Sequence, residues 1–190
     1  MNETVTIGNQ VWSTKNLDES TFRNGDFIIE AKTDQAWEVA GKLGTPAWCY
    51  YNNDPANGTK YGKLYNWHAV NDPRGLAPEG FHIPSDAEWK TLIKEYLGTS
   101  GAGKKMKSAE GWDENENGSN ETGFSGLPSG CRDYNGPFAN IRILGTWWST
   151  TEDNDGNVFI RALSSNSDNP IKNYGYKEDG FSVRCIKDNN

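Results

Sequence analysis

The amino-acid sequence predicts an α+β fold, in which an antiparallel sheet is accompanied by two short helices and long loops. Only 34% of the residues are hydrophobic, but 8 Trp, 8 Tyr and 7 Phe supply large side chains for a core. The 21 Gly, together with frequent Asn, Asp and Ser, indicate many tight turns. Strand-like segments fill the last third of the chain, and one segment before it has a strong helical pattern. We expect one domain over residues 1–190, because no internal repeat or linker-like stretch divides the chain.

The chain opens with the pattern of a β-hairpin. Residues 4–7 and 10–13 flank a Gly-Asn pair, which two-residue hairpin turns prefer. Between residues 17 and 57 the pattern is irregular, although the aromatic residues at 48–51 indicate a strand. This segment is the least predictable part of the sequence.

Two segments have helical patterns. Residues 61–70 carry aromatic and apolar side chains close to helical spacing, which predicts one short helix. The stronger signal is the capping box formed by Ser85 and Glu88. Apolar residues then follow Trp89 at i+3, i+4, i+7 and i+8, which predicts a helix over about residues 86–97.

The later third of the chain is predicted to form strands at residues 146–149, 158–163 and 181–186. The last of these alternates apolar with mostly polar residues, which is typical of a strand with one buried face. Residues 113–123 are acidic and polar and contain Gly, so we expect a surface loop there.

Charge and hydropathy exclude two classes of partner. The formal net charge of −7 argues against nucleic acid, which needs clustered Lys and Arg on the protein. No stretch approaches the roughly 18 apolar residues of a transmembrane helix. No positively charged start followed by an apolar run is visible at Met1, so a secreted form would have had its signal peptide removed.

The three cysteines, Cys49, Cys131 and Cys185, lie far apart in the sequence. They form no CxxC pair and no Cys/His spacing, which excludes a zinc ribbon. Two interpretations remain open. One is a disulfide with one free thiol, and the other is three buried thiols that act as small hydrophobic groups.

Six blocks of sequence follow one another along nearly the whole chain: residues 5–12 with Asn16 and Leu17, then 61–67, 80–89, 121–130, 147–149 and 180–187. Together they resemble the Fibrobacter succinogenes major paralogous domain (FISUMP) family. The resemblance implies a C-type-lectin-like fold, distantly similar to formylglycine-generating sulfatase-modifying enzymes. It also implies an extracellular or bacterial cell-surface location, in secreted proteins or lipoproteins, but no particular ligand. Ala77 departs from the family pattern, in which a Cys is common at this point, so the resemblance does not imply a disulfide from here to Cys185.

Two oxygen-rich segments are candidate calcium sites, because calcium takes carboxylate and amide oxygens as ligands. The candidate ligands are Asp113, Asn115, Asn117 and Glu121 in the first, and Asp153, Asp155 and Asn157 in the second. The first imitates the start of an EF-hand loop but has Phe124 where the closing Glu belongs. The alternative interpretation is a pair of solvated acidic turns.

Five aromatic residues are candidate ligand contacts, because carbohydrate-binding proteins stack flat rings on sugar faces: Tyr134, Trp147, Trp148, Tyr174 and Tyr176. Neighbouring residues on a strand point to opposite faces, so we expect one of the two Trp side chains to be exposed. The alternative is that both pack beneath loops.

The sequence predicts no catalytic residues. The only histidines, His68 and His82, stand in no arrangement that indicates catalysis. We therefore expect a non-catalytic extracellular binding module that recognises a glycan or a surface protein through its loops. Two alternatives remain: a polysaccharide-acting hydrolase with a pair of carboxylates, and a structural or pilus-tip-like surface domain.

Overall fold

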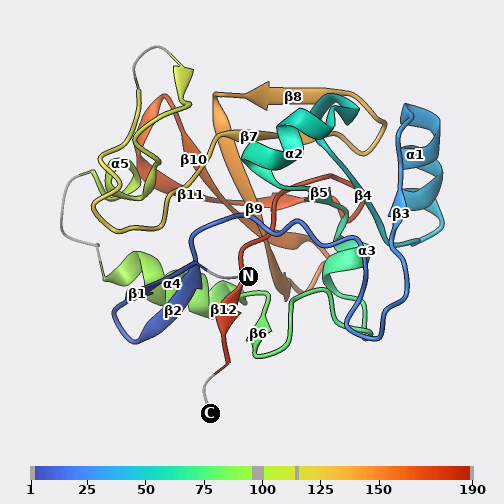
Figure 1. Cartoon of the computed structure of the whole chain (residues 1–190), viewed down its shortest axis with the longest axis horizontal. Coiled ribbons are helices and arrows are strands. Elements are labelled where there is room, and N and C mark those ends of the chain that lie inside the picture. Colours follow the sequence, from blue (N-terminus) through green and yellow to red (C-terminus); the bar gives the residue numbers. More distant parts are fainter. Residues whose placement is uncertain (1–2, 96–100, 114–115, 189–190) are drawn as a thin grey trace.

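The computed structural model describes residues 3–95, 101–113 and 116–188. These residues form an α+β structure of three sheets, with short helices around them (Figure 1). Helix α1 lies at one end of the molecule and α5 lies near the other (Figure 1).

The largest sheet has five strands in the order β11-β10-β9-β7-β8. Its strands are β7 (Ser129–Arg132), β8 (Phe138–Ile141), β9 (Leu144–Glu152), β10 (Val158–Ser164) and β11 (Ser167–Gly175). Neighbouring strands are antiparallel, except that β7 pairs with β9 in parallel. The strands predicted at residues 146–149 and 158–163 are confirmed, since they lie within β9 and β10.

Two smaller sheets complete the framework. One has the order β1-β2-β12-β6, and the other has the order β3-β4-β5. Their strands are β1 (Thr4–Ile7), β2 (Gln10–Ser13), β6 (Phe81–His82) and β12 (Ile186–Lys187), then β3 (Ile29–Glu30), β4 (Ala47–Cys49) and β5 (Leu64–Tyr65). The predicted opening hairpin is confirmed as β1 and β2, with Gly8 at a φ of 59° in its turn.

The described residues contain more helices than the two that the sequence predicts. They are α1 (Asp34–Lys42), the 3₁₀ helix η1 (Tyr51–Asn53), α2 (Pro55–Tyr61), α3 (Trp67–Val70), α4 (Asp86–Lys94) and α5 (Ala102–Met106). The capping box at the start of α4 is confirmed, and the predicted end of this helix lies outside the described residues. The single helix predicted over residues 61–70 is wrong. Gly62, at a φ of 71°, ends α2, and Asn66 caps a separate α3.

The prediction that Trp147 or Trp148 is exposed is wrong, because both faces of β9 are covered. Trp147 and Trp148 are 1% and 0% exposed. The ring centroid of Trp147 lies 6.3 Å from that of Trp89 on α4, in one hydrophobic cluster. On the opposite face, the ring centroid of Trp148 lies 4.7 Å from that of Phe181, in a second cluster. Trp147 and Trp148 do point to opposite faces of β9, but each face packs against a hydrophobic cluster.

The closing segment also differs from its prediction. All the residues from 181 to 186 are buried, including Ser182 and Arg184, so neither face of this segment meets solvent. Only Ile186 and Lys187 form a strand with neighbours on both sides. The segment runs between two clusters of the core, and its polar side chains are hydrogen-bonded there.

The three cysteines are free and buried, which agrees with the interpretation of three small hydrophobic groups. Burial raises the pKa of Cys185 to about 12, so its thiol stays protonated. Ala77 and Cys185 both belong to the largest hydrophobic cluster.

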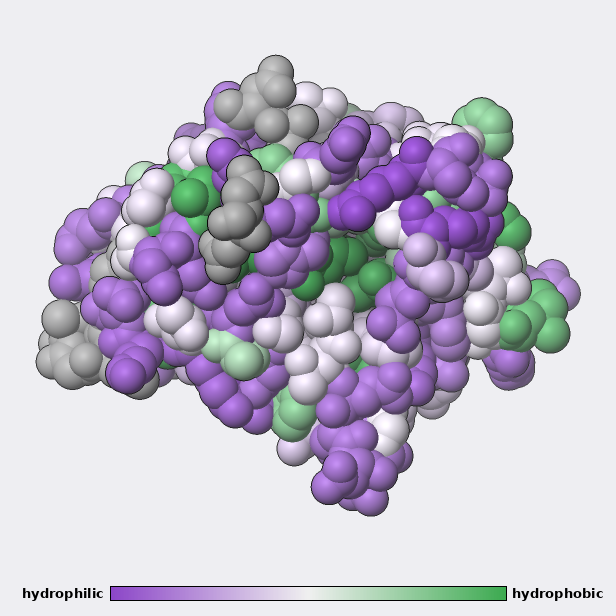
Figure 2. Space-filling view, turned by 90° about the horizontal axis from the view of Figure 1, so that it is seen from below, coloured by the Kyte–Doolittle hydropathy of each residue, from purple (hydrophilic) through white to green (hydrophobic). Residues whose placement is uncertain are grey.

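No helix in the described ranges is both long enough and apolar enough to cross a bilayer. The face of the molecule shown in Figure 2 is mainly hydrophilic, and apolar side chains occupy only small areas of it.

Candidate ligand-binding site

Two turns that are distant in the sequence lie side by side. The first turn, residues 133–137, joins β7 to β8, and the second, residues 176–179, follows β11. The backbone N–H of Arg132 donates to the carbonyl of Gly180 at 2.9 Å, and the N–H of Gly180 donates back at 2.7 Å. This pair of hydrogen bonds places Tyr134 and Tyr176 next to each other.

The Asp179 carboxylate joins the two turns. Its Oδ1 accepts from the backbone N–H of Tyr134 at 3.1 Å, and its Oδ2 accepts from the N–H of Tyr176 at 3.0 Å. The two Tyr ring centroids are 5.6 Å apart, with 78° between the ring planes. Tyr134 is 50% exposed and Tyr176 is 66% exposed. The turns therefore present two fixed aromatic rings to solvent.

Helix α1 forms the wall beside these rings. The Thr33 side chain caps the helix by accepting from the N–H of Ala36 at 3.1 Å. Trp37 is buried, and its Nε1–H donates to the carbonyl of Glu178 at 2.9 Å. A Cβ on Gly41 would lie 2.8 Å from the Cβ of Glu178, so only Gly permits this close approach. The helix is thus attached directly to the second turn.

The helix and the two turns enclose a groove of about 370 Å³. Glu38 and Lys42 line it from the helix, and Tyr134, Tyr176 and Glu178 line it from the turns. The Nζ of Lys42 lies 2.5 Å from Oε1 of Glu38, as an i,i+4 ion pair on one helix face. The groove combines flat apolar rings with a rim of charged hydrogen-bonding groups. We call these five residues the tyrosine groove.

Arg132 supports the tyrosine groove from beneath. Its side chain is fully buried, and the guanidinium donates to the carbonyls of Ala31 and Gly136 at 2.6 Å and 2.7 Å. A third bond reaches Oδ1 of Asp34 at 3.2 Å, at the start of α1. One side chain therefore connects the first turn to the helix that forms the wall.

The pKa of the Asp179 carboxyl group is raised by its surroundings. Burial raises its pKa to about 6, which outweighs the lowering effect of the N–H groups of Tyr176 and Tyr134. The nearby charges of Asp133 and Glu178 raise it further. The group that joins the two turns therefore titrates close to neutral pH.

The structure brings together only two of the five aromatic residues proposed from the sequence. Tyr134 and Tyr176 form the groove, whereas Tyr174 lies against Phe159 with ring centroids 4.9 Å apart. Trp147 and Trp148 are buried, so they offer no surface to a ligand.

The side chains of the first proposed calcium loop are directed to separate partners. Asp113 forms an ion pair with Arg142 at 2.8 Å, and Glu121 forms one with Lys105 at 3.3 Å. Oδ1 of Asn117 accepts from the N–H of Trp112 at 3.0 Å. Asn115 lies outside the described residues.

The second proposed calcium loop is a hydrogen-bonded turn. Oδ1 of Asp153 accepts from the backbone N–H groups of Asp155 and Asn157, each at 2.9 Å. Within residues 3–95, 101–113 and 116–188, no three His, Cys, Asp or Glu side chains gather as metal ligands. The proposed calcium site in this segment stays a prediction.

Four residues of the site were not among those predicted from the sequence: Glu38, Lys42, Glu178 and Asp179. A local signal existed for the helix, since Thr33 and Asp34 are typical of a helix start and Glu38 and Lys42 have i,i+4 spacing. No local signal exists for Asp179, because its partners include Tyr134, 45 positions earlier in the chain.

The sequence pattern described as the Fibrobacter succinogenes major domain matches residues 5–187. The matched range includes both turns and the whole of α1. No curated protein and no solved structure matches the chain.

Proposed function

The chain belongs to the Fibrobacter succinogenes major domain family, and we propose that it is a non-catalytic binding module for glycans. The proposed setting is the bacterial cell surface or the extracellular space, and the proposed scaffold is C-type-lectin-like. The α+β framework, with the proposed ligand contacts on its loops, supports that scaffold. The tyrosine groove is the proposed glycan site.

One observation carries the proposal: two exposed Tyr rings are held at a fixed angle beside charged hydrogen-bonding groups. The face of an aromatic ring is electron-rich and attracts the C–H groups on the flat side of a sugar. Glu38, Lys42 and Glu178 at the rim supply acceptors and donors for sugar hydroxyls. A groove of about 370 Å³ lies within the usual size of small-ligand sites.

The hydrogen bonds of Asp179 favour binding in a second way. A ligand that immobilises a mobile loop loses part of its binding free energy to the ordering of that loop. The backbone of Tyr134 and Tyr176 is already held by one carboxylate, so this cost is reduced.

The test is binding of the purified protein to an array of bacterial, plant and mucin glycans, with calcium and again with chelator. We expect binding in both conditions, because the proposed contacts involve no metal. A variant that combines Tyr134→Ala with Tyr176→Ala should lose the signal and keep the melting temperature of the wild type. The proposal would be contradicted if the wild type bound no glycan on the array, or if the double variant bound as strongly as the wild type.

A further inference from the structure

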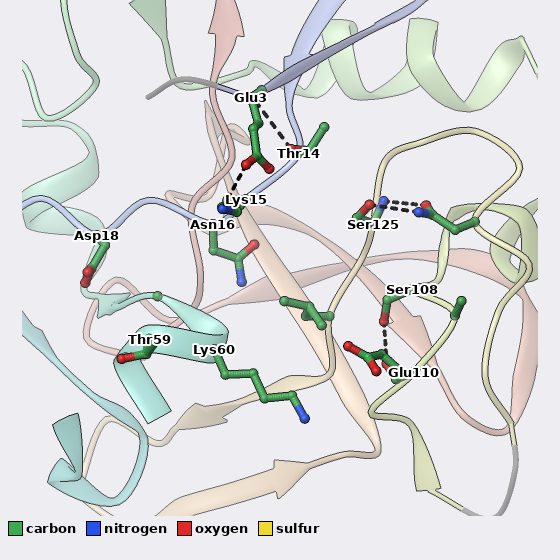
Figure 3. A pocket seen from close by; sticks show the side chains of 15 residues that line it. Glu3, Thr14, Lys15, Asn16, Asp18, Thr59, Lys60, Ser108, Glu110 and Ser125 are labelled. Carbon is green, nitrogen blue, oxygen red and sulfur yellow. Dashed lines mark hydrogen bonds and ion pairs between the residues drawn. The ribbon is translucent and has the colours of Figure 1, made fainter. Parts of the chain in front are cut away.

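A second cavity lies away from the tyrosine groove. It is a cleft of about 500 Å³ between the end of β2, helix α2 and residues 108–110 and 120–127 (Figure 3). Most of the residues that line it are polar, and they include Lys15, Asn16, Lys60, Glu110, Asn120 and Ser125. We call it the polar cleft.

The floor of the polar cleft is fixed by Asn16, whose side-chain amide is fully hydrogen-bonded. Its Oδ1 accepts from Nε1 of Trp147 at 2.8 Å and from Nε of Arg184 at 2.7 Å. Its Nδ2 donates to the carbonyl of Tyr61 at 2.8 Å and to Oγ of Ser182 at 3.2 Å. Asn16 therefore shapes the floor and has no bonding capacity left for a ligand.

A strained loop forms one side of the cleft. Asn120 and Ser125 have positive φ values of 53° and 54°. Asn accepts this conformation readily, whereas it is unfavourable for Ser. The Asn120 side chain locks the loop by accepting from the N–H of Ser125 at 2.8 Å and donating to its Oγ at 2.9 Å. Such strain concentrates at functional sites, where the surrounding structure maintains it.

Buried Arg184 maintains this loop. Its Nη1 donates to the carbonyl of Phe124 and its Nη2 donates to the carbonyl of Ser125, each at 2.8 Å. Nη1 also donates to the carbonyl of Ser13 at 2.7 Å, next to the other wall. A buried cation bonded to carbonyls on both sides keeps the cleft open in one shape.

Most charges of the lining are paired within the protein. Lys15 lies 3.1 Å from Glu3, and Asp18 lies 2.6 Å from the buried Lys63. Within each pair the positive and negative charges cancel, so the two pairs give the cleft no net preference for an anion or a cation.

Lys60 and Glu110 differ from these paired residues. Both are exposed, and they point into the same space from different elements (Figure 3). In the part of the chain that the structure describes, no ion pair within 4.0 Å includes either residue. Nζ of Lys60 lies 3.5 Å from the position of a Cβ on Gly111, so the ammonium group is close to the segment that carries Glu110. The cleft thus presents one cation and one anion that a ligand can bridge.

We propose that the polar cleft binds a small zwitterion, a free amino acid or dipeptide, with its carboxylate at Lys60 and its ammonium group at Glu110. Such a ligand has no net charge and complements both open charges of a lining that is otherwise neutral by pairing. The cleft volume suits a ligand of dipeptide size.

The test is titration calorimetry with a panel of free amino acids and simple dipeptides, followed by N-acetylated and C-amidated forms of the best ligand. Each blocked form lacks one charge and should bind about tenfold more weakly, because each loses a charge-assisted hydrogen bond. Lys60→Met and Glu110→Gln should each cause a similar loss. Both side chains are exposed, so both variants should keep the wild-type melting temperature.

Two control variants separate this site from other surfaces. Lys94→Met removes an exposed Lys from α4, and Tyr176→Ala alters the tyrosine groove. Neither should change zwitterion affinity. The proposal is overturned if no member of the panel binds, if the blocked forms bind as tightly as the parent, or if Lys60→Met and Glu110→Gln leave affinity unchanged.

Discussion

The tyrosine groove and the polar cleft each depend on a different charged side chain, which forms hydrogen bonds with backbone groups of segments that are distant in the sequence. In the groove, the Asp179 anion accepts from two N–H groups. In the cleft, the Arg184 cation donates to three carbonyls. The two side chains differ in the pH range in which they change charge. Burial lowers the pKa of Arg184 only to about 9, whereas burial raises that of Asp179 to about 6. The cleft therefore keeps its support at neutral and mildly acidic pH, and the groove loses it as pH falls.

The largest expected effect is the loss of stability on Arg184→Met. The substitution removes the Arg184 donors from the buried carbonyls of Ser13 and Phe124 and from the half-buried carbonyl of Ser125, and each unsatisfied buried carbonyl costs about 1–3 kcal/mol. We expect the free energy of unfolding to fall by at least about 3 kcal/mol, measured from the urea midpoint.

Arg142→Met is the matched control, because this Arg side chain is 59% exposed and pairs with Asp113 at the surface. Its free energy of unfolding should change by no more than about 0.5 kcal/mol. Equal losses in the two variants would show that the buried cation is not what holds the cleft together.

The next effect is a pH dependence confined to the groove. As pH falls through about 6, Asp179 becomes protonated and accepts the N–H groups of Tyr134 and Tyr176 less strongly. Glycan affinity should weaken roughly tenfold between pH 7.5 and 5. Asp179→Asn should bind weakly at both pH values, since its amide nitrogen cannot accept a hydrogen bond.

The free energy of unfolding should change with pH in the direction opposite to glycan affinity. The folded pKa of Asp179, about 6, is higher than the ordinary value of 3.8, so the folded state binds the proton more tightly between these values. The contribution of this group to the free energy of unfolding therefore rises as pH falls through that window. Comparing urea midpoints of wild type and Asp179→Asn across pH isolates this contribution. If acidification lowers both the glycan affinity and this contribution to stability, the assignment of the pH dependence to Asp179 is refuted.

The smallest effect concerns the wall of the groove. Thr33→Ala removes the cap of α1 and should cost about 1 kcal/mol of stability, with a modest loss of glycan affinity. Ser85→Ala removes the cap of α4 and should cost a similar amount without changing glycan affinity. If both variants bind equally well, the position of α1 does not matter for the ligand.

Local patterns in the sequence were sufficient for the parts of the fold that depend on neighbouring residues. The opening hairpin follows from its Gly-Asn turn, and the start of α4 follows from Ser85 and Glu88. Gly62 was a local signal as well, but the helical spacing around it obscured the break between α2 and β5.

The tertiary environment was not predictable in the same way. Alternation on β9 correctly placed Trp147 and Trp148 on opposite faces, yet only the fold shows that both faces are covered. Tyr134 and Tyr176 were recognised as candidate contacts by residue type. Their meeting depends on the pairing of Arg132 with Gly180, which no local pattern encodes.

The most direct test of glycan binding in the tyrosine groove compares two single variants by titration calorimetry, with a glycan selected on the array. Tyr176 lies in the groove and is 66% exposed, whereas Tyr174 lies outside it and is 51% exposed. Tyr176→Ala should weaken binding about thirtyfold, equal to about 2 kcal/mol, and Tyr174→Ala should leave it unchanged. Equal affinities of the two variants would contradict the account, and so would a loss confined to Tyr174→Ala.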